Sequence, residues 1–129
     1  MRIDELSVGD WVRYRDREWQ VCSLYQFTEE VGLWRKDSQF CETITDIQPI
    51  RITTEILEKN GLEFIDDGND AVIFLCSDMF WAKLCVGDCF WSIGVHSEDR
   101  LDAVMCDVKY VHQLQHALRL AGVGKEIEL

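Results

Sequence analysis

The sequence predicts an α+β fold, in which an all-β N-terminal part precedes a mixed part of helices and antiparallel strands. Three observations predict it. Short segments rich in β-forming residues fill the first fifty positions, a helix with clear start and stop signals follows, and a C-terminal segment repeats its apolar residues at helical spacing. The 129 residues suffice for one domain or two small ones. We therefore predict an all-β subdomain over 1–50 and an α+β subdomain over 51–129, packed as one unit.

The N-terminal strands are predicted by alternating side-chain character. Val12 and Tyr14 point to one face of the first strand, whereas Trp11, Arg13 and Arg15 point to the other. Strands are expected over residues 11–15, 18–25, 31–35 and 40–47. This density of short strands indicates a small curled sheet, an SH3-like or partly open barrel.

A short helix is predicted between Thr53 and Gly61. The Thr53 hydroxyl can accept a hydrogen bond from a free N–H of the first turn, where the helix dipole also favours the Glu55 carboxylate. Ile52 and Leu57 have the spacing of a hydrophobic staple, and Gly61 can adopt the left-handed conformation that ends a helix. A helix of about seven residues is too short to be stable without packing.

The remaining elements are a five-strand antiparallel meander and a C-terminal amphipathic helix. The meander strands are expected over residues 62–65, 71–76, 79–85, 89–95 and 101–106. The helix is expected from Val108 to Ala121, with Asp107 as its N-cap and Gly122 or Gly124 at its end. Its polar side is predicted to carry Lys109, His112, Gln113, Gln115, His116 and Arg119. Residues 125–129 could add a short edge strand.

The charge is strongly acidic, with 24 Asp and Glu against 13 Lys and Arg and a net charge of -11. Residues 53–129 carry a net -8 of this charge. Such a surface repels phosphate backbones, which disfavours general nucleic-acid binding. The ordinary interpretation is solubility. The alternative is an acidic face offered to a basic partner, including mimicry of DNA.

The cellular compartment is predicted from two sequence features: the character of the first residues and the length of the longest apolar run. The first residues contain no apolar segment of a secretory signal, and no apolar run approaches the ~18 residues of a membrane span. We expect a cytoplasmic protein with no membrane partner. Its six cysteines are then expected to be reduced thiols of the core.

Three segments resemble a known family. Glu5–Val12 (ELSVGDWV) is similar to a start of the form LRIGNWV, residues 47–61 are similar to a centre of the form PIPLTPEILEKNGF, and Lys109–Gln115 contains YVHQLQ. In this order they resemble small proteins of Bacteroidales genomes, their phages and mobile elements. The chain departs from the family after Gln115, and Thr54 stands where the family often has proline. The resemblance supports the predicted fold and implies a bacterial or phage setting and a cytoplasmic protein, but no particular activity.

His112 and His116 are four residues apart on the final helix, so their rings can share a face. This is the spacing of a helical metal pair. Gln113 stands where the zinc-protease pattern has a glutamate, and glutamine cannot act as a base. A third ligand would have to come from elsewhere, such as His96 or Asp107. The ordinary interpretation is two half-exposed histidines on a solvated or partner-facing stripe.

Trp11, Arg13 and Arg15 form a second candidate surface, because Trp and Arg are frequent in binding hot spots. Alternatively, the Trp11 side chain packs into one end of the predicted barrel and the two arginines are solvated. Cys85 and Cys89 are separated by three residues, where a zinc knuckle normally has two, so they indicate a hairpin more than a metal site.

No motif of catalysis is present. The acidic segment 66–70 fits a turn better than a calcium loop, and the sequence has no nucleophile elbow, phosphate loop or dinucleotide fingerprint. We assign no catalytic, cofactor or metal residue. The interaction candidates are Trp11, Arg13, Arg15, His112 and His116.

The leading hypothesis is a non-enzymatic cytoplasmic interaction protein, an accessory product of phage or mobile-element origin. It would bind a protein of unknown identity, and a homo-oligomer stays open. The alternatives are an acidic DNA-mimic inhibitor of a nucleic-acid-binding protein, and a small metal-binding protein or hydrolase.

Overall fold

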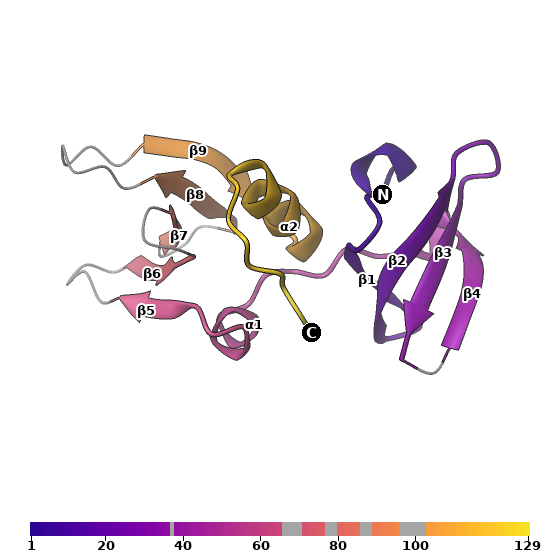
Figure 1. The fold of residues 1–129 in the computed structure, drawn as a ribbon, viewed down its shortest axis with the longest axis horizontal. Coiled ribbons are helices and arrows are strands. Elements are labelled where there is room, and N and C mark those ends of the chain that lie inside the picture. The colour runs from indigo at the N-terminus through magenta and orange to yellow at the C-terminus, as the bar shows by residue number, and fades with distance from the viewer. Residues whose placement is uncertain (37, 66–70, 77–79, 86–88, 96–102) are drawn as a thin grey trace. The chain divides into compact units, whose positions relative to one another are not determined.

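The computed structural model describes residues 1–36, 38–65, 71–76, 80–85, 89–95 and 103–129. These residues form two antiparallel sheets and two α-helices, which confirms the α+β class (Figure 1). They divide into two compact units: unit 1 holds residues 1–51, 110–112 and 129, and unit 2 holds residues 52–109 and 113–128. No helix in the described part has the length and apolar character needed to cross a membrane.

Unit 1 contains a four-stranded sheet in which the strands pair in chain order. Its elements are η1 (Ile3–Glu5), β1 (Trp11–Tyr14), β2 (Arg17–Tyr25), β3 (Glu30–Arg35), β4 (Ser38–Thr43) and η2 (Ile44–Asp46). The predicted strand over 40–47 therefore ends early, in a 3-10 turn. After this turn, Gln48 makes a single antiparallel bridge to Arg13 beside β1.

The core of unit 1 lies on the concave side of this sheet. As predicted, Val12 and Tyr14 both point inward and are buried. The buried core comprises Leu6, Val12, Tyr14, Trp19, Val21, Val31, Leu33, Ile44 and Ile47. Tyr14 in β1 and Phe40 in β4 have ring centroids 5.3 Å apart although their strands are opposite edges, so the sheet is curled. No sheet of the described residues is closed into a barrel.

The hairpin between β1 and β2 corrects one prediction. Tyr14 pairs with Arg17, so the connection is the two residues Arg15 and Asp16, with φ of +49° and +62°. Positive φ at both positions is what a tight hairpin of this kind requires. Arg15 therefore does not share the strand face of Trp11, because the strand ends at Tyr14.

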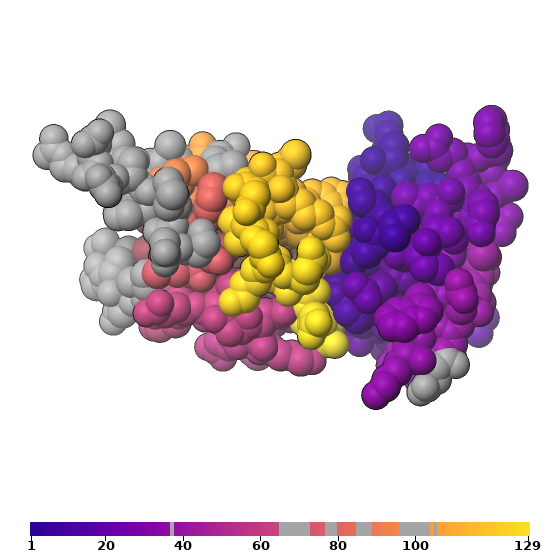
Figure 2. Space-filling model, in the orientation of Figure 1, coloured from indigo at the N-terminus to yellow at the C-terminus, as the bar shows by residue number. Residues whose placement is uncertain are grey.

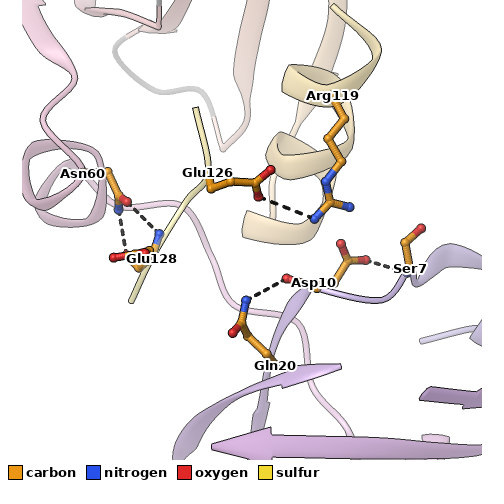
Figure 3. Close-up of polar contacts among 8 residues, drawn as sticks. Ser7, Asp10, Gln20, Asn60, Arg119, Glu126 and Glu128 are labelled. Carbon is orange, nitrogen blue, oxygen red and sulfur yellow. Dashed lines mark hydrogen bonds and ion pairs between the residues drawn. The ribbon is translucent and has the colours of Figure 1, made fainter. Parts of the chain in front are cut away.

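The turn before β1 is anchored by Asp10. The Ser7 N–H donates to Asp10 Oδ2 at 2.8 Å, and the Asp10 N–H donates to the Ser7 carbonyl at 3.1 Å (Figure 3). The Val21 N–H donates to the Asp10 carbonyl at 2.8 Å, and Asp10 is fully buried. This turn fixes where the first strand begins.

Unit 2 contains the predicted five-strand antiparallel meander, with the strands again in chain order. The strands are β5 (Glu63–Ile65), β6 (Ala71–Leu75), β7 (Phe80–Cys85), β8 (Trp91–Val95) and β9 (Ala103–Val108). The helix before them is α1 (Thr54–Lys59), and its predicted ends are confirmed. Thr53 Oγ1 accepts from the Ile56 N–H at 3.3 Å, and Gly61 has φ of +73°.

The C-terminal helix α2 (Val111–Leu120) is shorter than predicted. Asp107 is not its N-cap, because β9 continues to Val108 and Asp107 accepts a hydrogen bond from Ser92. Instead, the Gln113 side chain accepts from the Lys109 N–H at 2.8 Å. Gly122 ends the helix with φ of +74°, as predicted.

Two further expectations for this end of the chain are wrong. His112 and Gln115 are buried, 3% and 2% exposed, and do not lie on a polar stripe. Residues 125–129 form no strand. Here the backbone of Glu128 is held by one side chain: Asn60 Nδ2 donates to its carbonyl at 2.8 Å and Asn60 Oδ1 accepts from its N–H at 2.7 Å (Figure 3). The Asn60 side chain thus makes the two hydrogen bonds to the Glu128 backbone that a neighbouring strand would otherwise make.

Candidate interaction site

A polar cleft of about 300 Å³ lies on unit 1. It is lined by Tyr14 from β1, Arg15 from the hairpin, Glu42 from β4 and Asp46 from η2. The curl of the sheet brings β4 toward β1, and the 3-10 turn after β4 adds the second carboxylate.

Hydrogen bonds hold both carboxylates in place. The Tyr14 hydroxyl donates to Glu42 Oε2 at 2.5 Å, and the Thr43 N–H donates to Glu42 Oε1 at 3.2 Å. The Thr43 hydroxyl donates to Asp46 Oδ2 at 2.9 Å. The Arg15 guanidinium lies over the Tyr14 ring, with Cζ 5.2 Å from the centroid. The cleft therefore presents fixed charges on a rigid strand and turn.

The hydrogen bond between Tyr14 and Glu42 sets the ionisation of the cleft. The hydrogen bond from Tyr14 lowers the pKa of Glu42, and the same bond raises the pKa of Tyr14. At neutral pH the tyrosine is thus protonated and the glutamate ionised. With Asp46 and Arg15, the cleft holds two carboxylates and one guanidinium, which suits a cationic group of a ligand.

Aromatic packing positions Tyr14. Its ring contacts Phe40, and Phe40 packs edge-on against Trp19 with centroids 4.7 Å apart. Arg35 Cζ lies 5.3 Å from the Trp19 centroid. The ordered rings limit the rotation of Tyr14 and so hold its hydroxyl at Glu42.

The free edge of β4 lies beside the cleft. β4 pairs with β3 on one side, and no other described strand pairs with it. The last pair in the register of β3 and β4 is Glu30 with Thr43. Directly after it, the Ile44 N–H donates to the Glu29 carbonyl at 2.8 Å, so Glu29 and Ile44 form a hydrogen-bonded pair. Hydrogen-bonded and non-hydrogen-bonded pairs alternate along an antiparallel ladder. The backbone N–H and C=O groups of Gln39 and Cys41 therefore point to the open edge.

The convex face of the same sheet carries separated aromatic residues. Trp34 on β3 is 45% exposed and lies between Gln20 and Gln39 on the neighbouring strands. Tyr25, the last residue of β2, is also exposed on this face. A row of small side chains lies between the two aromatics, so they do not form one continuous apolar patch: Ser23, Gly32 and Cys41.

The N-terminal candidates occupy three different settings. Trp11 is half-buried, and Arg13 makes a 3.5 Å ion pair with Glu18, which is half-buried as well. Of the three predicted residues, Arg15 alone lines the cleft. The structure therefore does not join Trp11, Arg13 and Arg15 into one surface.

The histidine candidates are also placed differently from the prediction. His112 stacks on Tyr110, with centroids 6.0 Å apart and rings 7° from parallel, whereas His116 is half-buried. Among the described residues no group of three His, Cys, Asp or Glu side chains could hold a metal. His96, the suggested third ligand, lies outside the described residues, as does the segment 66–70.

The cysteines are not uniformly core residues. Cys76 is buried, and burial raises its pKa to about 11. Cys41 and Cys89 are exposed, while Cys22 and Cys106 are half-buried, and all five are free thiols. The expectation of core thiols is therefore wrong for Cys41 and Cys89, whose side chains are exposed to solvent.

The proposed acidic face of residues 53–129 lies largely outside the described residues. The acidic side chains not described there are Asp66, Asp67, Asp70, Asp78, Asp88, Glu98, Asp99 and Asp102. The DNA-mimic hypothesis stays a prediction.

Glu42 and Asp46 were missed by the sequence analysis. A usable signal was present, because Thr43 and Asp46 have the Thr-x-x-Asp spacing that marks the start of a helical turn. Because Ile44 and Ile47 are apolar and β-branched, the sequence analysis assigned this turn to the end of a strand. Comparison of the chain with protein-family models, curated proteins and solved structures finds no significant match.

Proposed function

We propose that this chain is a non-enzymatic, cytoplasmic interaction protein, an accessory product of phage or mobile-element origin. Its cleft on unit 1 binds a basic side chain of a protein partner. The observation that carries the proposal is the cleft itself, in which Glu42 and Asp46 are fixed beside the Tyr14 ring. Lysine and arginine fit this setting because carboxylates attract cations and accept their hydrogen bonds.

The ionisation of Tyr14 and Glu42 supports a binding role over a catalytic one. General acid–base catalysis works best when the pKa lies near the operating pH. Here the pKa of Tyr14 is raised and that of Glu42 is lowered, so both move away from neutrality.

The connectivity of unit 1 supports an SH3-like arrangement for the binding unit. Four antiparallel strands are followed by a 3-10 turn, and the chain then returns to β1 through the Arg13–Gln48 bridge. Such small curled sheets leave strand edges and loops available for contacts. The cleft lies where this return brings η2 next to the first hairpin.

The test is a tagged pull-down from a lysate of the organism that encodes the chain, with nuclease treatment and mass spectrometry. The wild type is compared with the variant Glu42→Gln plus Asp46→Asn, which keeps shape and removes both charges. Glu18→Gln is the matched control, because Glu18 is a half-buried, ion-paired carboxylate outside the cleft.

A protein captured by the wild type and the control, and at least tenfold depleted with the double variant, is the expected result. Equal capture by all three proteins would refute the cleft as the binding site. A nucleic-acid-binding protein that DNA displaces from the chain, independently of Glu42 and Asp46, would favour the acidic-mimic hypothesis instead.

A further inference from the structure

The open edge of β4 is protected by one charged side chain, Glu42, near its end, and by none at its start or centre. Natural edges are commonly blunted by lysine, proline or a bulge. β4 has the sequence SQFCET, with no lysine or proline, and its register with β3 is regular. By contrast, β1 at the other edge is bridged by Gln48. Figure 1 shows β4 as the outermost strand of its sheet, and the surface of unit 1 around it appears in Figure 2.

The two ends of β4 carry opposite net charges, although Asp37 reduces the positive charge at the start of the strand. Arg35 pairs with Ser38 at the start of the strand, and Lys36 follows in the turn. Glu42 lies near the end of the strand, and Asp46 lies in the turn after it. A strand with this charge gradient is complementary to a second copy of itself, running antiparallel. A parallel copy would place like charges opposite each other.

We propose that two copies of this chain associate through their β4 edges, antiparallel about a two-fold axis at Cys41. The inference rests on the proposed interaction function and names the partner as a second copy. The edge-facing N–H and C=O groups of Cys41 meet those of the other Cys41. Beyond the strand ends, this register directs the turn residue Lys36 of one copy toward Asp46 in η2 of the other, so Lys36 is the basic group that enters the cleft.

The register places the two exposed Cys41 side chains next to each other on the same face of the joined sheet. A hydrogen-bonded antiparallel pair has Cα atoms about 5.5 Å apart. This lies within the range of about 4.4–6.8 Å that a disulfide requires. Two Cys41 thiols can therefore be linked across the axis once the strands move slightly together, because the Cβ atoms of a disulfide lie closer than those of such a pair. Cys89 is also exposed but belongs to unit 2, so it serves as an internal control.

The association is measured by sedimentation equilibrium of the purified full chain under reducing conditions. Cys41→Pro removes the edge N–H at a position that donates nothing to β3, and Cys41→Val keeps it. Two hydrogen bonds per dimer are lost with proline, so the dimer dissociation constant is expected to rise about 30-fold. Cys41→Val is expected to change it less than about threefold.

Charge reversal tests the register. Lys36→Glu and Asp46→Lys are each expected to weaken the dimer about tenfold, and the double reversal is expected to restore it. Diamide, which accepts two electrons and two protons from a thiol pair, is expected to link Cys41 to Cys41 in preference to Cys89. Peptide mapping identifies the linked residues.

A chain that is monomeric up to millimolar concentration overturns the inference, and so does a dimer unaffected by Cys41→Pro. Crosslinks equally frequent at Cys89 also overturn it. These outcomes leave the proposed function separately testable. A monomer that still captures a foreign protein through Glu42 and Asp46 retains the cleft function, whereas a dimer that captures nothing retains only self-association.

Discussion

Replacing Gly94 by alanine should measure how tightly the sheet of unit 2 is packed. Gly94 in β8 pairs directly with Trp81 in β7, and the Trp81 indole occupies the space where a Cβ at position 94 would lie. An added Cβ would overlap the ring, with Cη2 at 2.5 Å and Cε2 at 2.6 Å. Trp81 is buried, so the ring cannot move into solvent without loss. We expect Gly94→Ala to reduce the free energy of unfolding by about 2 kcal/mol, within the ~1–3 kcal/mol of overpacked cores.

The assay is urea unfolding followed by circular dichroism, with the slope m compared between variants. Trp81→Phe removes the ring atoms that the new methyl would meet. In that background Gly94→Ala should cost less than about 0.5 kcal/mol, a coupling of about 1.5 kcal/mol. Gly32→Ala is a second control, because its nearest obstacle is the rotatable Ser23 hydroxyl. The steric explanation fails if Gly94→Ala costs the same beside phenylalanine as beside tryptophan.

Three further predictions follow from single contacts. Thr53→Ala should cost about 1 kcal/mol in urea unfolding by removing the cap of α1, whereas Thr53→Ser should stay near the wild type. At pH 8, iodoacetamide should label Cys89 in the native protein but Cys76 only after unfolding, because the pKa of Cys76 is about 11. Tyr14→Phe should destabilise the protein above about pH 4.5, the ordinary glutamate pKa. The difference should vanish as the pH falls through the lowered pKa of Glu42, and a loss that stays constant at every pH down to acid unfolding would contradict this.

The fold was predictable where local signals and packing agree. The cap at Thr53 and the left-handed Gly61 set the ends of α1, and both signals act within a few residues. The alternation of Val12 and Tyr14 gave the buried face of β1 for the same reason. The meander followed from short β-forming segments separated by turn residues.

Predictions failed where long-range contacts override local pattern. His112 and Gln115 look polar on a helical projection, yet both are buried in the folded chain. Asp107 has a good N-cap side chain, but pairing with β8 extends the strand past it. Helical spacing states which residues share a face and does not reveal what the rest of the chain places against that face.

The cleft combines one residue that the sequence suggested with others that it did not. Arg15 was a candidate, but as part of a flat strand face and not as a hairpin residue over Tyr14. Glu42 joins the cleft through a hydrogen bond from Tyr14, 28 positions away in the chain, and this bond depends on the curl of the sheet. Such tertiary pairs cannot be read from spacing in a single sequence.

The dependence of self-association on salt follows from two electrostatic effects of different range. Each chain carries a net charge of -11, so two copies repel over distances longer than the contacts between Lys36 and Asp46. At about 0.01 M salt the screening length is about 30 Å and the repulsion dominates, whereas at 0.15 M it is about 8 Å and the repulsion is largely screened. Near 1 M, with a length of about 3 Å, the local pairs are screened as well. Dimerisation should therefore be strongest at intermediate salt in sedimentation experiments. The Lys36→Glu plus Asp46→Lys variant should keep this maximum, because it preserves both the net charge and the complementary ends. A dimer that strengthens steadily up to 1 M salt would instead indicate apolar contacts and refute the charge-directed register.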